Sequence, residues 1–222
     1  MNNILKKSCI FEMLYIARSD SRIDGRSVYE ARFETGRHLA KLYPIKADFV
    51  SGAPDSGVVS GRGYAEESGI PYIDALSKNR YIGRSFILPE QLIREKSVKI
   101  KLNAIRSNII GKKIILVDDS IVRGTTCRKT VEMLKVAGAS EVHLMVASPP
   151  IKHPCYYGVD MTSYDQLIAA NHTNEELCKL IGADSINYIP LDILINCCGA
   201  NGDKGFCTAC FTGDYPINIE NK

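Results

Sequence analysis

A run of four aliphatic residues at positions 114–117 leads directly into two acids and a short polar loop, in the stretch Ile-Ile-Leu-Val-Asp-Asp-Ser-Ile-Val-Arg-Gly-Thr-Thr. Consecutive aliphatic residues are typical of a strand that is covered on both faces, as in a parallel sheet. Asp118 and Asp119 would then lie at the carboxyl end of the strand, and open α/β sheets bind their ligands at that edge. The stretch therefore predicts an α/β fold with a ligand site beside the two acids.

The polar residues of this stretch indicate what the ligand carries. Two adjacent carboxylates are costly at a sheet edge unless they accept hydrogen bonds from hydroxyl groups or bind a metal ion. The loop that follows, Arg123-Gly124-Thr125-Thr126, offers backbone N–H groups and hydroxyls that can bind a phosphate at the start of the next helix. The sequence thus predicts a ligand with a diol at one end and a phosphoryl group at the other.

The rest of the chain alternates between strand and helix patterns. Ser27 and Glu30 form a capping-box pattern that predicts a helix reaching about Leu42. The charged stretch 78–106 has little clean periodicity and predicts a mobile lid. Strands are predicted at 47–51, 71–76, 114–118 and 142–147. Further helices are predicted through Tyr64 and Ala65, ending at Gly69, and at 126–137, 165–170 and 174–181. The unit 114–147 reads as a βαβ crossover of a parallel sheet.

Composition restricts the class of protein. A chain of 222 residues with 45% hydrophobic and 24% charged residues is long enough for one substantial core, so a single domain over 1–222 is the simplest expectation. A net charge of +3 without a polybasic tail argues against a nucleic-acid partner. No signal peptide and no apolar run of membrane-spanning length is seen, so the sequence predicts a cytoplasmic protein without a membrane partner.

At residues 117–126 the chain resembles the phosphoribosyl pyrophosphate (PRPP) signature of type I phosphoribosyltransferases. The alternative is a generic strand–turn–helix with a surface acid pair, but the acids, the glycine and the paired threonines occur together behind a buried strand. Segments 9–25, 53–57, 78–91 and 206–216 are similar to the synthase half of glutamine PRPP amidotransferases. The resemblance runs from about residue 9 to 216 and implies a type I phosphoribosyltransferase fold, with a mostly parallel twisted sheet, helices on both faces and a flexible lid loop.

The resemblance assigns roles to individual residues. It implies that Asp118 and Asp119 hold the ribose hydroxyls directly or through Mg²⁺, with Ser56 also at the metal site. Lid residues that it implies contact PRPP or act in catalysis are Lys78, Arg80, Tyr81 and Arg84. Further positions that it implies bind substrate are Asp55 and Ser56 in the pyrophosphate loop, and Ser120, Arg123, Gly124, Thr125 and Thr126 around the 5-phosphate.

The chain has eight cysteines, which in a reducing compartment favour thiols or metal ligation over disulfides. By itself, the pair Cys207 and Cys210 is half of a zinc site, a redox pair or neither. The resemblance implies that Cys9, Cys155, Cys207 and Cys210 hold a 4Fe-4S cluster, so that segments 1–25 and 196–222 flank the domain and carry the cluster. The other cysteines and the four histidines show no ligand pattern.

The resemblance also implies the reaction, which is transfer of ammonia to PRPP, giving 5-phosphoribosylamine and pyrophosphate. The 222 residues have no counterpart of the family's glutaminase domain, so we expect either a truncated product or a free-standing synthase that takes free ammonia or the ammonia of a separate glutaminase. Homo-oligomers and feedback inhibition by purine nucleotides are further expectations. Two alternatives are a salvage phosphoribosyltransferase that uses a free base and a PRPP-binding regulatory protein.

Overall fold

The computed structural model describes residues 7–79, 102–199 and 205–217 of the chain. Its centre is a parallel sheet with the strand order β4-β7-β8-β9. The four strands are β4 (Phe49–Gly52), β7 (Lys113–Asp118), β8 (Glu141–Val146) and β9 (Ser185–Tyr188). The α/β fold with a mainly parallel sheet, predicted from the sequence, is confirmed.

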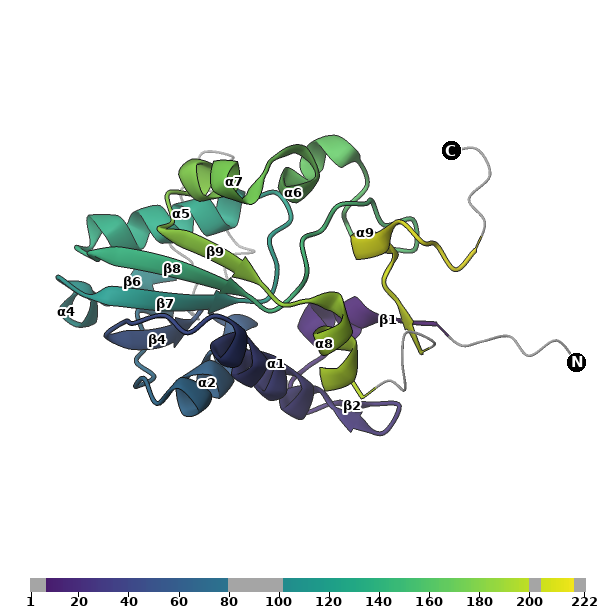
Figure 1. Cartoon of the computed structure of the whole chain (residues 1–222), viewed down its shortest axis with the longest axis horizontal. Coiled ribbons are helices and arrows are strands. Elements are labelled where there is room, and N and C mark those ends of the chain that lie inside the picture. Colours follow the sequence, from purple (N-terminus) through teal and green to yellow (C-terminus); the bar gives the residue numbers. More distant parts are fainter. Residues whose placement is uncertain (1–6, 80–101, 200–204, 218–222) are drawn as a thin grey trace, which may run out of the picture.

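The central strand β7 is covered on both faces, as its unbroken aliphatic run predicts. Ile115 and Val117 belong to one hydrophobic core, whereas Ile114 and Leu116 belong to a second. Helices α1 (Val28–Leu42) and α2 (Gly57–Ser68) cover one face of the sheet, and α5 (Thr125–Val136) and α7 (Asn174–Ile181) cover the other (Figure 1). The alternation of side chains along a strand therefore divides the interior into two layers.

Helices α1 and α2 approach each other closely enough for their backbones to touch. A Cβ atom added at Gly36 of α1 would lie 1.8 Å from the carbonyl oxygen of Ser60, and one added at Gly63 of α2 would lie 2.0 Å from that of Phe33. Neither position tolerates a side chain without movement of a whole helix. The glycines therefore set the separation of the two helices, and α2 begins at the edge of the sheet where the acids lie.

Several predicted helix ends are confirmed. The Ser27 side chain accepts a hydrogen bond from the Glu30 N–H at the start of α1. Gly69 ends α2 in the left-handed conformation, with φ of 71°. Helix α7 occupies the predicted residues 174–181 and has a complete capping box between Thr173 and Glu176.

Other predictions were wrong in detail. The strand predicted at 71–76 contributes only a single parallel bridge between Val50 and Tyr72, and β5 (Leu76–Lys78) instead pairs antiparallel with β6 (Leu102–Ala104). The predicted helix 165–170 is a 3₁₀ turn (Tyr164–Gln166) followed by the short α6 (Ile168–Asn171). Strand β9 and helix α8 (Leu191–Cys197) were not predicted.

Short elements near the two ends of the chain lie against each other. Strand β1 (Ser8–Cys9) pairs parallel with β10 (Phe206–Cys207), so that Cys9 faces Cys207 in register. A π-helix (Glu12–Ile16) follows β1, and α9 (Ala209–Thr212) follows β10. The remaining elements are β2 (Arg22–Ile23), β3 (Arg26–Ser27) and α4 (Arg106–Ile109).

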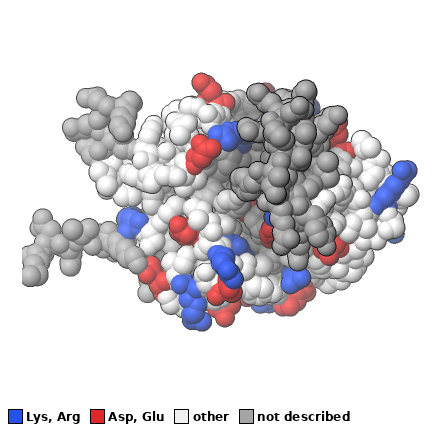
Figure 2. Space-filling model, turned by 180° about the vertical axis from the view of Figure 1, so that it is seen from behind, with Lys and Arg blue, Asp and Glu red and all other residues white. Residues whose placement is uncertain are grey.

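The described surface carries charges of both signs. On the face shown in Figure 2, lysines and arginines are interspersed with aspartates and glutamates over the described residues. This mixture agrees with the small net charge of +3. Among the described residues, no helix is long and apolar enough to span a membrane.

Candidate active site

The carboxyl ends of β4 and β7 place the two predicted ligand loops side by side. The Ala53 N–H donates to the carbonyl oxygen of Val117 over 2.8 Å, which carries the register of the sheet beyond the end of β4. A Cβ atom at Gly57 would lie 2.1 Å from the same carbonyl oxygen. Glycine at this position thus lets the loop 53–57 lie directly against the two acids.

The acid pair is held by short polar contacts. The Ser56 hydroxyl donates to one carboxylate oxygen of Asp119, and the Ser120 hydroxyl donates to the other over 2.6 Å. One oxygen of Asp118 accepts the Asp119 N–H over 2.9 Å. Ser56, which the resemblance assigned to the metal site, is therefore joined directly to the acid pair.

Burial and the neighbouring charge raise the pKa of Asp118 well above its ordinary value. Desolvation is the larger cause, and repulsion from Asp119 is the next. A bound cation would remove the penalty of ionising both carboxyl groups at once. Oxygen donors from two carboxylates and a hydroxyl are the kind that Mg²⁺ binds, so the residues present fit this ion.

A cavity of about 330 Å³ adjoins the acids. This is within the range of about 300–1,000 Å³ that is typical of small-molecule sites. Gly124, with φ of 70°, precedes α5 and starts the helix at Thr125, so the first N–H groups of α5 lie at the cavity. The cavity is lined by Tyr15, Ala53, Pro54, Ser56, Leu102, residues 118–127 and Thr130.

The structure thus brings together most of the predicted substrate residues. Ser56, Asp118, Asp119, Ser120 and the loop 123–126 all line this one cavity. Asp55 lies beside it and forms an ion pair with Lys78, the first residue of the predicted lid motif. The predictions for Arg80, Tyr81 and Arg84 fall outside the described residues.

The Arg123 side chain has partners of its own in the 158–166 segment. Its Nη2 lies 2.6 Å from the Gln166 amide oxygen and 3.3 Å from an Asp160 carboxylate oxygen. The sequence motif predicted only that Arg123 belongs to the phosphate loop. The backbone of the loop, together with the threonine hydroxyls, therefore remains available to a phosphate.

The residues lining the cavity that sequence reasoning missed include Tyr15 and Leu102. Tyr15 projects from the π-helix and is exposed, and Leu102 begins β6. The buried Arg32 of α1 supports the π-helix, because its guanidinium donates to the carbonyl oxygens of Met13 over 2.8 Å and Ala17 over 2.9 Å. The only sequence signal for this contact was Arg32 itself. A buried arginine requires hydrogen-bond acceptors, which here are the carbonyl oxygens of the π-helix segment.

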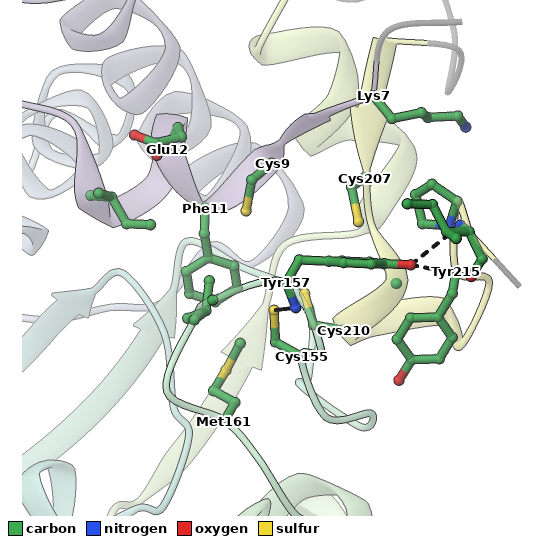
Figure 3. A pocket seen from close by; sticks show the side chains of 16 residues that line it. Lys7, Cys9, Phe11, Glu12, Cys155, Tyr157, Met161, Cys207, Cys210 and Tyr215 are labelled. Atoms are coloured by element: carbon green, nitrogen blue, oxygen red, sulfur yellow. Dashed lines mark hydrogen bonds between the residues drawn. The ribbon is translucent and has the colours of Figure 1, made fainter. Parts of the chain in front are cut away.

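The four predicted cluster cysteines line a second cavity of about 350 Å³ (Figure 3). They come from separate parts of the chain, because Cys9 lies in β1, Cys207 in β10, Cys210 in α9 and Cys155 in the loop after β8. Burial raises the pKa of the Cys9 thiol, and the nearby Cys207 and Cys155 raise it further. Burial and the same neighbours also raise the pKa of Cys210.

An all-sulfur donor set fits soft metals and iron–sulfur clusters. A single zinc ion with Zn–S bonds of about 2.3 Å would hold its sulfurs about 3.8 Å apart. In the part of the chain that the structure describes, no group of three or more histidine, cysteine or acidic side chains is arranged to hold one metal ion. The four cysteines line a cavity of about 350 Å³.

The comparisons with known proteins agree with this site. A family model described as the phosphoribosyl transferase domain matches residues 30–178. The amidophosphoribosyltransferase of Archaeoglobus fulgidus is 54% identical over 212 residues, covering 95% of this chain and 46% of the relative. That of Bacillus subtilis is 48% identical over 220 residues, covering 98% of this chain and 46% of the relative.

The solved structures give the same result. The glutamine PRPP amidotransferase of Bacillus subtilis, complexed with ADP and GMP, superposes with a TM-score of 0.89 at 47% identity, covering 99% of this chain and 49% of the other. The chain thus spans about half the length of these relatives. Since the family model matches more than half of the 222 residues, the chain belongs to the phosphoribosyl transferase domain family, with the amidophosphoribosyltransferases among its relatives.

Proposed function

We propose that this chain binds PRPP with Mg²⁺ and transfers ammonia to it, giving 5-phosphoribosylamine and pyrophosphate, which is the first step of purine synthesis. One observation carries the proposal: the acid pair Asp118/Asp119 and the phosphate loop 123–126 line a single cavity at the carboxyl edge of the sheet. Similarity to amidophosphoribosyltransferases over nearly the whole chain supports the choice of ammonia as acceptor.

Different residues of the cavity bind different parts of PRPP. The loop 123–126 and the start of α5 take the 5-phosphate, because they line the cavity and the first N–H groups of a helix have no intrahelical partner. Asp118 and Asp119 accept the ribose hydroxyls or hold the metal, and the loop 53–57 takes the pyrophosphate. Mg²⁺ would supply charge neutralisation for the departing pyrophosphate. Lys78, already paired with Asp55, adds a positive charge beside that group.

We expect the 222-residue chain to release pyrophosphate from PRPP with ammonia as donor and to give no turnover with glutamine alone. The chain covers 46% of the amidophosphoribosyltransferases of Archaeoglobus fulgidus and Bacillus subtilis. Free ammonia, and not ammonium, attacks the sugar, so the rate at fixed total ammonia should rise with pH. The measurement is pyrophosphate release with Mg²⁺ over a pH series. The same assay is run with free purine and pyrimidine bases in place of ammonia. Turnover with a base but not with ammonia would favour a salvage enzyme.

We further propose that Cys9, Cys155, Cys207 and Cys210 hold a 4Fe-4S cluster. The cluster would link the N-terminal and C-terminal segments covalently. The pairing of β1 with β10 already places Cys9 beside Cys207. The raised pKa values of Cys9 and Cys210 favour the protonated thiols of these two residues, so metal binding to them must release protons.

Protein purified without oxygen is expected to be brown, with iron and acid-labile sulfide in equal amounts. Cys155→Ser should lose most of the iron, because it removes one of the cavity thiols. Cys178→Ser is the matched control, since Cys178 lies on α7 outside this cavity, and it should retain iron. Stoichiometric zinc without sulfide in the parent protein would contradict the cluster.

Purine nucleotides are proposed as ligands of this chain as well, because the Bacillus subtilis relative was solved with ADP and GMP. A nucleotide carries the same ribose 5-phosphate group that the cavity is suited to bind. Competition of GMP against PRPP in the ammonia assay would test whether a nucleotide occupies the same cavity.

A further inference from the structure

The phosphate loop is braced from outside the cavity by the segment 160–168, which we call the strap. The guanidinium of Arg123 donates to the Gln166 amide oxygen through both Nη2, over 2.6 Å, and Nε, over 3.2 Å. Two donors converging on one acceptor fix the plane of the guanidinium as well as its position. Asp160 adds a longer contact of 3.3 Å, but its side chain is 83% exposed, so solvent screens this ion pair.

The backbone of the strap also joins the phosphate loop. The Ile168 N–H donates to the carbonyl oxygen of Val122 over 3.0 Å, immediately before Arg123. The Ile168 side chain lies against Gly124, where an added Cβ would be 2.7 Å from its terminal carbon. The loop is therefore held on both sides of Arg123, by a hydrogen bond before it and by an apolar contact after it.

The strap is itself anchored in the interior. Leu167, between Gln166 and Ile168, is fully buried, and Met161, next to Asp160, is 1% exposed. Met161 accepts the Cys155 N–H over 2.7 Å and lines the cysteine cavity. Gln166 thus presents its amide oxygen from a fixed backbone, which is what an acceptor needs in order to position a long, flexible arginine.

The uncharged acceptor has an electrostatic consequence. A carboxylate in contact with Arg123 at low exposure would cancel its charge, whereas the Gln166 amide orients the guanidinium and leaves its positive charge largely available. That charge then lies beside the N-terminus of α5, where the helix dipole also favours an anion. The positive charge of Arg123 and the dipole of α5 therefore both favour an anion at the start of α5.

We propose that Gln166 is a positioning residue for the phosphate loop: by holding the Arg123 guanidinium against the strap, it fixes the backbone N–H groups of residues 123–126 for the 5-phosphate. This inference rests on the proposed function, because it assumes that the loop binds the 5-phosphate of PRPP. In this proposal Arg123 stabilises the loop conformation, and the loop backbone and the threonine hydroxyls contact the phosphate.

A set of four variants tests the brace: Gln166→Leu, Arg123→Met, the double variant, and Gln166→Glu, which keeps the acceptor. Calorimetry with ribose 5-phosphate measures phosphate binding, and the ammonia assay gives KM and kcat for PRPP. Gln166→Leu and Arg123→Met should each weaken ribose 5-phosphate binding and raise KM about fivefold, as expected for one net hydrogen bond. The kcat should stay within about twofold, because the 5-phosphate is remote from the reacting carbon.

The double variant should be no weaker than either single variant, because both remove the same contact. Gln166→Glu should bind more tightly than Gln166→Leu, because it keeps an acceptor for Arg123, but more weakly than the parent protein, because its carboxylate neutralises the guanidinium; a merely space-filling role of Gln166 would not explain this order. Unchanged binding by Gln166→Leu, or a loss confined to Arg123→Met, would overturn the brace and make Arg123 a direct phosphate ligand. Parent protein that binds neither ribose 5-phosphate nor PRPP would overturn the proposed function instead.

Discussion

Asparagine at either Asp118 or Asp119 is expected to lower PRPP turnover at least about 100-fold, a loss comparable to that of one preorganised catalytic contact. The two carboxyl groups lie next to each other at the end of β7, and Asp119 is already held by Ser56 and Ser120. Each asparagine retains the shape of the side chain but removes the charge that a metal or a ribose hydroxyl requires. Turnover of each variant is measured with ammonia and saturating Mg²⁺.

Asp118→Asn should fold at least as well as the parent protein. Since the folded-state pKa of Asp118 is raised, its protonated form is the stabilised one. That stabilisation is present below the unfolded-state pKa and is lost as the pH rises through the folded-state pKa. Asp118→Asn is neutral at every pH, so in metal-free buffer at neutral pH its unfolding temperature should equal or exceed that of the parent, and the difference should shrink on acidification.

Asp192→Asn serves as the control, because Asp192 is an acid in the first turn of α8 and does not line the active-site cavity. It should leave turnover within about twofold of the parent. If both active-site variants kept full turnover and full affinity for PRPP with Mg²⁺, the assignment of this cavity as the active site would be wrong.

Gly36→Ala or Gly63→Ala should lower the free energy of unfolding by about 3 kcal/mol. This value lies near the upper end of the range that is typical when extra atoms are inserted into a packed interior. Helix propensity alone favours alanine over glycine by about 1 kcal/mol, so the expected sign is opposite to that of an isolated helix. The reason is the backbone contact between α1 and α2, where the added Cβ atoms would lie 1.8 Å and 2.0 Å from carbonyl oxygens. For a domain of this size the midpoint of thermal unfolding should fall by roughly 6–12 °C.

Val136→Ala is the matched helix variant, because Val136 lies in the last turn of α5 and is 78% exposed. It removes no buried contact, so its midpoint should be unchanged or slightly raised by the better propensity of alanine. Thermal unfolding followed by circular dichroism compares the three variants. A midpoint for Gly36→Ala at or above that of the parent would show that the two helices can separate without cost.

The sequence by itself determined the features that depend on neighbours along the chain. The aliphatic run before Asp118 specified β7, and the capping residue Ser27 specified where α1 begins. These signals are local, because a strand's period and a helix cap involve side chains only a few residues apart. The motif at 117–126 also predicted the acid pair and the phosphate loop, which the structure places around one cavity.

Only the tertiary structure decided which distant segments meet. The segment predicted as a strand at 71–76 forms only a single bridge with β4, and strand β9 was not predicted. Whether either segment pairs as a strand depends on partner strands far along the chain. The parallel pairing of β1 with β10 brings Cys9 to Cys207, although nearly the whole chain separates them. The contact of Arg123 with Gln166 likewise depends on the path of the strap, since no local hydrogen-bond pattern links residues 43 positions apart.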